Sequence, residues 1–323
     1  MRIRCIPELV PRPIPEESCP ACGRPRIPYV PRCICGHVHV DMTEEVTPII
    51  QGLRAPKPTG TFRLAHWSDL HQGSRWPLGL DVAARLRNLL SALVQLEVDG
   101  LIVSGDLTQF GKPGELLEVR QHLEAFGFDA RRRLVVPGNH DVARGTRNRD
   151  FEDVFEVSYP WVGEIGPGIA VVAFDSNLLE ERTLFERGWV NVRGRVGSEA
   201  MNMARTELET VPAETRLLVL HHHLGRLPPE RRWATFDEHT FKVDQYLMAP
   251  LVDAGEVLAF AREAGVTAVL HGHKHWYSRT GYRVGALPVF NAGSVTLMRH
   301  PQFRLFDFRQ GEWCALYRVE VNF

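Results

Sequence analysis

Five short polar segments constrain this sequence most, because each one follows an apolar run of strand length. The segments contain Asp69 and His71, Asp106, Asn139 to Asp141, His221 to His223, and His273 to His275. Open α/β sheets place their ligand-binding residues at the carboxyl ends of the strands. The pattern therefore predicts one polar site that is assembled from five strand ends.

From Thr61 onward, strand-like and helix-like segments alternate, and closely spaced strands follow in the last third. We expect strands over 64–68, 100–104, 133–136, 169–174, 216–220, 266–270, 282–290, 303–308 and 313–321, and helices over 81–96 and 113–126. This order suits two packed sheets whose outer faces are covered by helices. We predict an α/β fold with two parts, a Cys- and Pro-rich head and linker over 1–60 and a main domain over 61–323.

Any one polar segment has an ordinary explanation, because an Asp after a strand often caps a helix and a lone His is more often a core residue than a ligand. Five in succession, all of residue types that bind metals, favour a metal site. Asp69 and His71 stand two positions apart, so on an extended backbone their side chains share a face and can share an ion. Asp106 has two carboxylate oxygens and can bridge two cations.

These segments resemble the motif series of the calcineurin-like metallophosphoesterases over about residues 61–300. The resemblance implies a four-layer α-β-β-α sandwich of two mixed sheets. It also implies a ligand set for two metal ions: Asp69, His71 and His275 for the first, Asn139, His221 and His273 for the second, and Asp106 between them. In the His triplet the resemblance selects the first position, and His222 and His223 stay as alternatives.

Two cations about 3.5–4 Å apart can bind the oxygens of a phosphate and activate a water molecule at neutral pH. The resemblance leaves His140 free of metal, so we expect it to protonate the leaving oxygen, with Asp141 orienting a nearby imidazole. A purely structural hydrogen bond is the alternative role of His140. A ligand set without thiolates suits Mn, Fe or Zn and does not choose among them.

The head contains paired cysteines. Cys19 and Cys22 resemble a zinc knuckle, and Cys33 and Cys35 would complete a tetrahedral zinc site in a small zinc-ribbon-like appendage. The second pair is separated by one residue instead of two, so His37 is an alternative ligand. Free or redox-active thiols are the alternative to a zinc site. The sequence does not decide whether this head braces the main domain or contacts nucleic acid.

The motif forms are similar to the cyclic-nucleotide branch of the family, so the first hypothesis is a two-metal phosphodiesterase for a nucleotide or cyclic nucleotide. Alternatives are a nuclease or nucleic-acid end-processing enzyme that uses the head for recognition, a phosphomonoesterase, and a phosphate-binding regulatory module. Trp233, Phe236 and His239 lie in a long segment without clear periodicity over 225–248 and are candidates for stacking a base. Anchoring that segment to the body is their alternative role.

The net charge of -1 gives no global electrostatic reason to bind nucleic acid. The sequence begins without the apolar stretch of a signal peptide, and no run reaches the roughly 18 apolar residues that a membrane span needs. We therefore expect a cytoplasmic protein without a membrane segment. Its oligomeric state is not indicated.

Overall fold

The computed structural model describes residues 2–7, 56–74, 81–142, 149–178, 194–224, 251–275, 282–284, 287–298 and 301–322. Its strands are β1 (Arg2–Pro7), β2 (Phe62–Trp67), β3 (Gly100–Val103), β4 (Arg133–Val135), β5 (Trp161–Gly166), β6 (Ile169–Ala173), β7 (Thr215–Val219), β8 (Ala268–His271), β9 (Tyr282–Val284), β10 (Leu287–Asn291), β11 (Gln302–Arg309) and β12 (Glu312–Asn322). Its helices are α1 (Val82–Gln95), α2 (Pro113–Ala125), α3 (Arg149–Phe155), α4 (Ser198–Leu208) and α6 (Ala254–Glu263). None of the helices in these ranges combines the length and apolar character of a membrane span.

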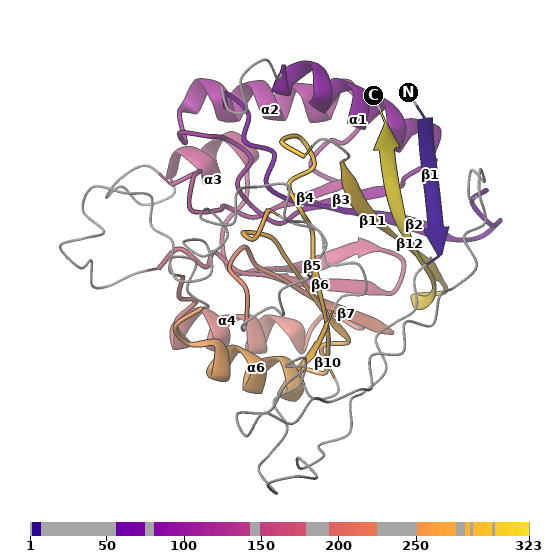
Figure 1. The fold of residues 1–323 in the computed structure, drawn as a ribbon. Coiled ribbons are helices and arrows are strands. Elements are labelled where there is room, and N and C mark those ends of the chain that lie inside the picture. Colours follow the sequence, from indigo (N-terminus) through magenta and orange to yellow (C-terminus); the bar gives the residue numbers. More distant parts are fainter. Residues whose placement is uncertain are drawn as a thin grey trace, which may run out of the picture.

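The strands form two six-stranded sheets that pack face to face (Figure 1). The first sheet has the order β1-β12-β11-β2-β3-β4, with β2, β3 and β4 parallel and the other pairs antiparallel. The second has the order β5-β6-β7-β8-β10-β9, with a parallel centre and an antiparallel strand at each edge. Both sheets are therefore mixed, as expected from the sequence.

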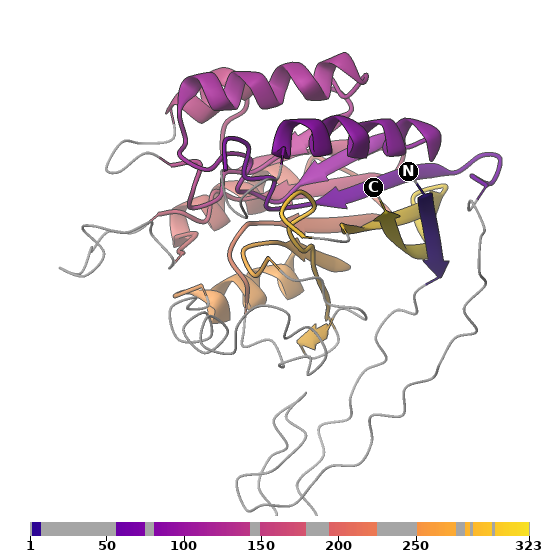
Figure 2. The ribbon, with the colours of Figure 1, turned by 45° about the horizontal axis from the view of Figure 1, so that its top comes forward.

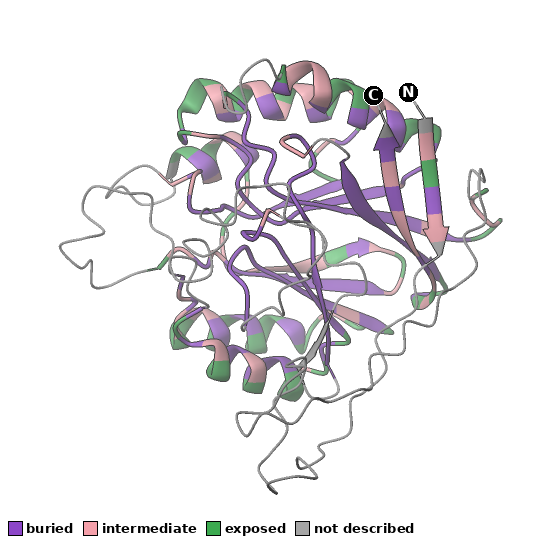
Figure 3. Ribbon diagram, in the orientation of Figure 1, coloured by how far each residue is buried: buried purple, intermediate pink, exposed green. Residues whose placement is uncertain are grey.

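Three apolar cores separate four layers. One lies between the first sheet and α1, α2 and α3, one between the second sheet and α4 and α6, and one between the sheets (Figure 2). The central core contains Leu64 and Ile102 from the first sheet and Leu217 and Phe290 from the second. Strands covered on both faces are buried along their length (Figure 3), which explains their continuous apolar runs. The predicted α-β-β-α arrangement is confirmed for the described residues.

The two predicted helices and the predicted strands are present, with ends shifted by a few residues, and the segment 282–290 is divided into β9 and β10. Asp81 is the N-cap of helix α1, because its carboxylate accepts a hydrogen bond from the Ala84 amide at 2.8 Å. The expectations missed α3, α4, α6, β5 and β1. Strand β5 has intermediate burial along most of its length and so lacks a clear apolar signal.

Strand β1 changes the predicted division of the chain. It pairs antiparallel with β12, with Cys5 opposite Val319, and the Cys5 side chain is buried against the first sheet. Residues 2–7 thus belong to the main domain, not to the head. Six residues are too short a run to identify as a strand before the partner strand is known. Residues 8–55 lie outside the described residues. They include the four cysteines expected to bind zinc, Cys19, Cys22, Cys33 and Cys35.

Candidate metal centre

The five polar segments converge on one side of the molecule, as the strand order requires. Asp69 and His71 follow β2, Asp106 follows β3, and Asn139 and His140 follow β4. From the second sheet, one segment follows β7 and another follows β8, and they carry His221, His273 and His275. Apart from His140 and His275, which are partly exposed, these residues are buried.

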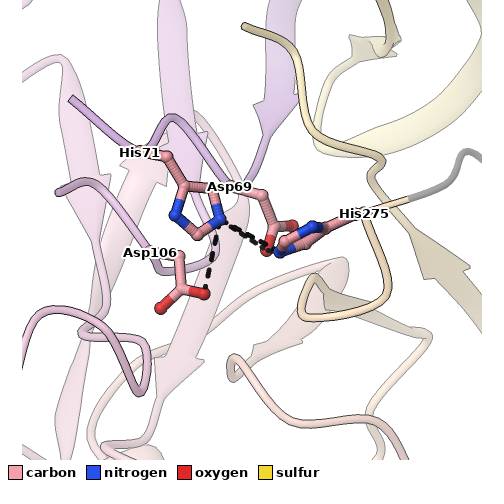
Figure 4. Close-up of side chains that lie close together, drawn as sticks. All are labelled: Asp69, His71, Asp106 and His275. Carbon is pink, nitrogen blue, oxygen red and sulfur yellow. Dashed lines mark hydrogen bonds and ion pairs between the residues drawn. The ribbon is translucent and has the colours of Figure 1, made fainter. Parts of the chain in front are cut away.

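Four side chains surround a first possible ion position: Asp69, His71, Asp106 and His275 (Figure 4). Their candidate ligand atoms all lie within 4.8 Å of one another. The Nε2 atom of His71 lies 3.0 Å from His275 Nε2 and 3.7 Å from Asp106 Oδ2. His275 Nε2 lies 3.5 Å from Asp69 Oδ1. Two carboxylate oxygens and two imidazole nitrogens therefore face a common point.

A second group lies beside the first and includes Asp106, His221 and His273, again with candidate ligand atoms within 4.8 Å of one another. The amide oxygen of Asn139 joins this group, at 3.1 Å from His221 Nε2 and 2.9 Å from His273 Nδ1. His221 Nε2 also lies 3.4 Å from Asp106 Oδ2. The structure thus brings together the four side chains that were expected to hold a second ion.

Asp106 connects the two groups through one oxygen atom. Its Oδ1 accepts a hydrogen bond from the His140 amide at 2.8 Å, whereas Oδ2 faces both groups. Among the described residues, Asp106 Oδ2 and Asp69 Oδ1 have no hydrogen-bond donor although both are buried. A buried carboxylate oxygen without a donor is costly. Cations at the two positions would compensate it, so the donor set fits a pair of metal ions.

The ionisation of these groups supports that fit. Burial raises the pKa of Asp69 to about 8, so its carboxylate needs a positive charge nearby. Burial also lowers the pKa of His71 and His273 well below the usual value, which keeps their lone pairs free for a metal. For His221 burial alone would lower the pKa, but the charge of Asp106 raises it to about 9. An ion that binds there replaces the His221 proton.

The three histidines of the triplet have different contacts. His221 lies within the second group, and its Nδ1 donates to the Ser104 carbonyl at 2.8 Å, which leaves Nε2 directed at Asp106 and Asn139. The ring of His222 is instead bonded through Nδ1 to the Ser176 hydroxyl at 2.8 Å. His223 is not among the grouped side chains of the described residues. The geometry therefore favours the first His of the three.

The backbone at the site is unusual. Eight non-glycine residues in the described part of the chain have positive φ, and five belong to the two groups. The five are Asp69, His71, Asp106, His273 and His275, with φ from 48° to 73°. Each such residue costs on the order of 1–3 kcal/mol unless its surroundings stabilise it. The expectation that Asp69 and His71 share a face of an extended strand is wrong in detail: β2 ends at Trp67, and a left-handed loop brings the two side chains together.

Two motif glycines provide the space for this packing. A Cβ atom on Gly105 would overlap the ring of His221, and Gly105 itself has a φ of 99°. A Cβ atom on Gly138 would overlap the backbone and carboxylate of Asp106. Larger residues at either position would displace the side chains on which both groups depend.

His140 lies beside the first group, with its ring centre 4.8 Å from that of His71. Its Nδ1 donates to the Gln109 carbonyl at 3.0 Å, so Nε2 is the nitrogen left to face a substrate. Because a main-chain carbonyl has no side-chain signature, the role of Gln109 could not be predicted from the sequence. The same reason explains why Ser104 was missed.

Asp141 does not orient an imidazole in the way we expected. Its carboxylate accepts hydrogen bonds from the amides of Gly138, Leu107 and Thr108, and from the Thr108 hydroxyl, at 2.8–3.0 Å. Burial raises its pKa to about 6, so the group is ionised at neutral pH and can accept all four. Asp141 thereby ties the loop of Asp106 to the loop of Asn139.

The residue pattern and its geometry agree with a comparison of the sequence with protein families, in which residues 62–277 match the calcineurin-like phosphoesterases. The chain belongs to this family. It is therefore a metal-dependent phosphoester hydrolase, and the family's dinuclear metal centre corresponds to the His and Asp cluster. The sequence expectation of this enzyme class is confirmed.

Two relatives have named activities. The phosphoesterase is 27% identical to a "Probable cyclic nucleotide phosphodiesterase" of Rhodococcus erythropolis, over 75% of this chain and 73% of that protein. It is 26% identical to a cAMP/cGMP dual specificity phosphodiesterase of Mycobacterium tuberculosis, over 75% of this chain and 70% of that protein. Its fold is similar to a dimetal phosphatase from Danio rerio, with a TM-score of 0.55 and 14% identity over 81% and 97% of the two chains.

Trp233, Phe236 and His239, the candidates for base stacking, lie outside the described residues. Their proposed role therefore stays a prediction.

Proposed function

We propose that this phosphoesterase hydrolyses phosphodiester bonds of nucleotides, cyclic nucleotides in particular, with two metal ions. The position of Asp106 Oδ2 carries the two-metal part of the proposal, because this unpartnered oxygen faces His71 on one side and His221 on the other. The nucleotide part is supported by the activities named for the two relatives.

In this proposal one ion is held by Asp69, His71 and His275, the other by Asn139, His221 and His273, and Asp106 is shared. The ions, when bound, would polarise the phosphate and supply a nucleophilic oxygen at neutral pH. The donor set contains carboxylate, amide and imidazole groups, which suits Mn, Fe or Zn.

The protein's own residues then provide orientation and a proton. The Gln109 carbonyl accepts the Nδ1 proton of His140 and fixes the ring, so that a ring protonated on both nitrogens would donate its Nε2 proton to the leaving oxygen and end as the neutral imidazole. Asp141 holds the Asp106 and Asn139 loops at a fixed separation, which keeps the ligand atoms in place for the transition state. His140 touches the substrate in this account, whereas Asp141 acts by positioning other residues.

The test is an activity panel on protein loaded separately with Mn, Fe(II) or Zn. It compares cAMP, cGMP and bis-p-nitrophenyl phosphate with p-nitrophenyl phosphate and with DNA and RNA oligonucleotides. We expect the small diesters to have the highest kcat/KM. Preference for the monoester would identify a phosphomonoesterase, and preference for oligonucleotides would identify the nuclease alternative. Binding without turnover of any substrate would indicate a regulatory module.

We also propose that Cys19, Cys22, Cys33 and Cys35 bind one structural zinc ion, on the basis of their paired spacing. The double substitution Cys19→Ser/Cys22→Ser in the full chain should remove one zinc per chain and leave hydrolysis of bis-p-nitrophenyl phosphate unchanged. Unchanged zinc content would contradict the site. If the variant loses oligonucleotide cleavage alone, the head recognises nucleic acid.

A further inference from the structure

Phe110 exposes an aromatic ring on the loop whose Gln109 carbonyl bonds to His140. It lies in the loop between β3 and α2, and 58% of the residue is exposed. The other large exposed hydrophobic residues in the described ranges are aliphatic or Met. A single exposed apolar residue is common on protein surfaces. Phe110 differs in its position, since it adjoins the residue that holds His140.

That position is defined by main-chain contacts. The carbonyl of Gln109, the preceding residue, accepts the hydrogen bond from His140 Nδ1 at 3.0 Å. Consecutive Cα atoms lie about 3.8 Å apart, so Phe110 begins one residue from the carbonyl that holds the proposed proton donor. The ring of His140 in turn lies 4.8 Å from that of His71, centre to centre. The Phe110 backbone therefore directly follows the residue that fixes the ring of His140.

The loop around Phe110 is well fixed. The Phe110 amide donates to Glu115 Oε2 at 3.1 Å, and the Gly111 amide donates to the Thr108 hydroxyl at 3.0 Å. Gly111 packs so closely on the next loop that a Cβ atom there would lie 2.6 Å from the Asp141 carbonyl oxygen. An aromatic ring on such a backbone is already positioned for binding, which lowers the entropic cost of recognition.

Lys112 adds a positive charge to the ring. Its Nζ lies over the Phe110 ring at 5.1 Å from the centroid, and 69% of its side chain is exposed. A cation over one face of the ring leaves the other face free to stack. An exposed ring next to an ammonium group fits a ligand that has both an aromatic face and a negative charge.

We propose that Phe110 and Lys112 determine specificity for the nucleobase side of the substrate, with Phe110 stacking on the base and Lys112 attracting the phosphate charge. The inference rests on the proposed diesterase function for its catalytic test. Its prediction is a preference for diesters with aromatic groups over diesters with aliphatic groups.

The kinetic test compares wild type with Phe110→Ala, Phe110→Trp and Lys112→Ala. Substrates are cAMP and an aliphatic diester, glycerophosphoethanolamine. Phe110→Ala should raise KM for cAMP about five- to tenfold with kcat nearly unchanged. Phe110→Trp, which keeps an aromatic ring, should have a KM for cAMP close to that of wild type. The kinetic constants for the aliphatic diester should be unchanged in both variants. Leu117→Ala, which removes another exposed side chain from the adjacent α2, is the matched control and should change neither substrate. Equal effects on both diesters, or none on cAMP, would overturn the inference.

A binding measurement separates this inference from the proposed function. AMP and ribose 5-phosphate differ only in the base, and calorimetry can measure their binding to the Mn-loaded full chain without turnover. We expect wild type to bind AMP more tightly than ribose 5-phosphate. In Phe110→Ala the ratio of these two affinities should fall about five- to tenfold. If the enzyme hydrolyses no diester but shows this difference, the function fails and the recognition site stands. An unchanged preference in Phe110→Ala contradicts the recognition site whatever the activity.

Discussion

Among the described residues, the loops of the first sheet supply the oxygen atoms that face the two ion positions, whereas those of the second sheet supply imidazoles. Asp69, Asp106 and Asn139 follow strands of the first sheet, and the second sheet contributes three histidines. The first sheet also contributes one imidazole, that of His71. Neither sheet's residues would hold two ions alone. Those of the first sheet bring negative charges together in a buried place, and those of the second sheet carry no negative charge. The centre exists only where the two sheets pack.

The second sheet also orients the carboxylates of the first. The His273 amide donates to Asp69 Oδ2 at 3.2 Å, and the Ser294 hydroxyl donates to the Asp69 carbonyl at 2.6 Å. In the other direction, the Ser104 carbonyl accepts from His221. These hydrogen bonds across the interface stabilise the left-handed backbone of both ligand loops. The geometry of the site thus depends on the packing of the two sheets.

The largest effect should follow removal of the shared oxygen. Asp106→Asn keeps the shape of the side chain but replaces the carboxylate that serves both groups, so we expect loss of at least one ion and a fall in kcat/KM of at least about 10⁴-fold. Metal analysis by mass spectrometry and hydrolysis of bis-p-nitrophenyl phosphate measure the two quantities. Asp99→Asn, a carboxylate on the first sheet away from the site, is the control. Full metal content and activity in Asp106→Asn would refute the shared ligand.

A smaller effect distinguishes two adjacent histidines of the second sheet. His221→Ala should lose one ion per chain and about 10³-fold in kcat, because the second group loses its Nε2 atom. His222→Ala removes a ring that bonds to Ser176, so both ions should remain and kcat should fall by less than about tenfold. The reverse result would assign the ligand to His222.

His140 should affect chemistry without affecting metal content. We expect His140→Ala to lower kcat for cAMP about 10²-fold, because its alkoxide leaving group needs a proton. With bis-p-nitrophenyl phosphate the decrease should be much smaller, since p-nitrophenolate leaves without one. Equal decreases on both substrates would point to a structural role for the ring.

Asp141 should have the smallest effect of the four. Asp141→Asn replaces an acceptor oxygen by a donor facing backbone amides, which should loosen the loops of Asp106 and Asn139 and weaken metal binding five- to tenfold. Calorimetric titration with Mn measures the affinity. The partly exposed Asp129, whose carboxylate bonds to Arg131, provides the control variant Asp129→Asn. Unchanged affinity in Asp141→Asn would mean that the loops hold their positions without it.

The residues expected at the site lie together, whereas several of the surrounding elements were not expected from the sequence. Asp106, His221 and their partners follow long apolar runs, and strands buried on both faces leave a strong signal. The left-handed backbone of Asp69 and His71 left none, because it depends on contacts from the other sheet. Strand β1 was missed for a related reason, since six residues become a strand only when β12 is available to pair with them.

The shared two-metal centre is tested by a titration of the metal-free protein with Mn(II), followed by electron paramagnetic resonance. Two ions that share Asp106 Oδ2 should bind with a stoichiometry of two per chain and give the spectrum of a spin-coupled pair. Asp106→Asn should abolish the coupling. A wild-type protein that binds one ion per chain at the His and Asp cluster, or two ions without coupling, would contradict a shared two-metal centre.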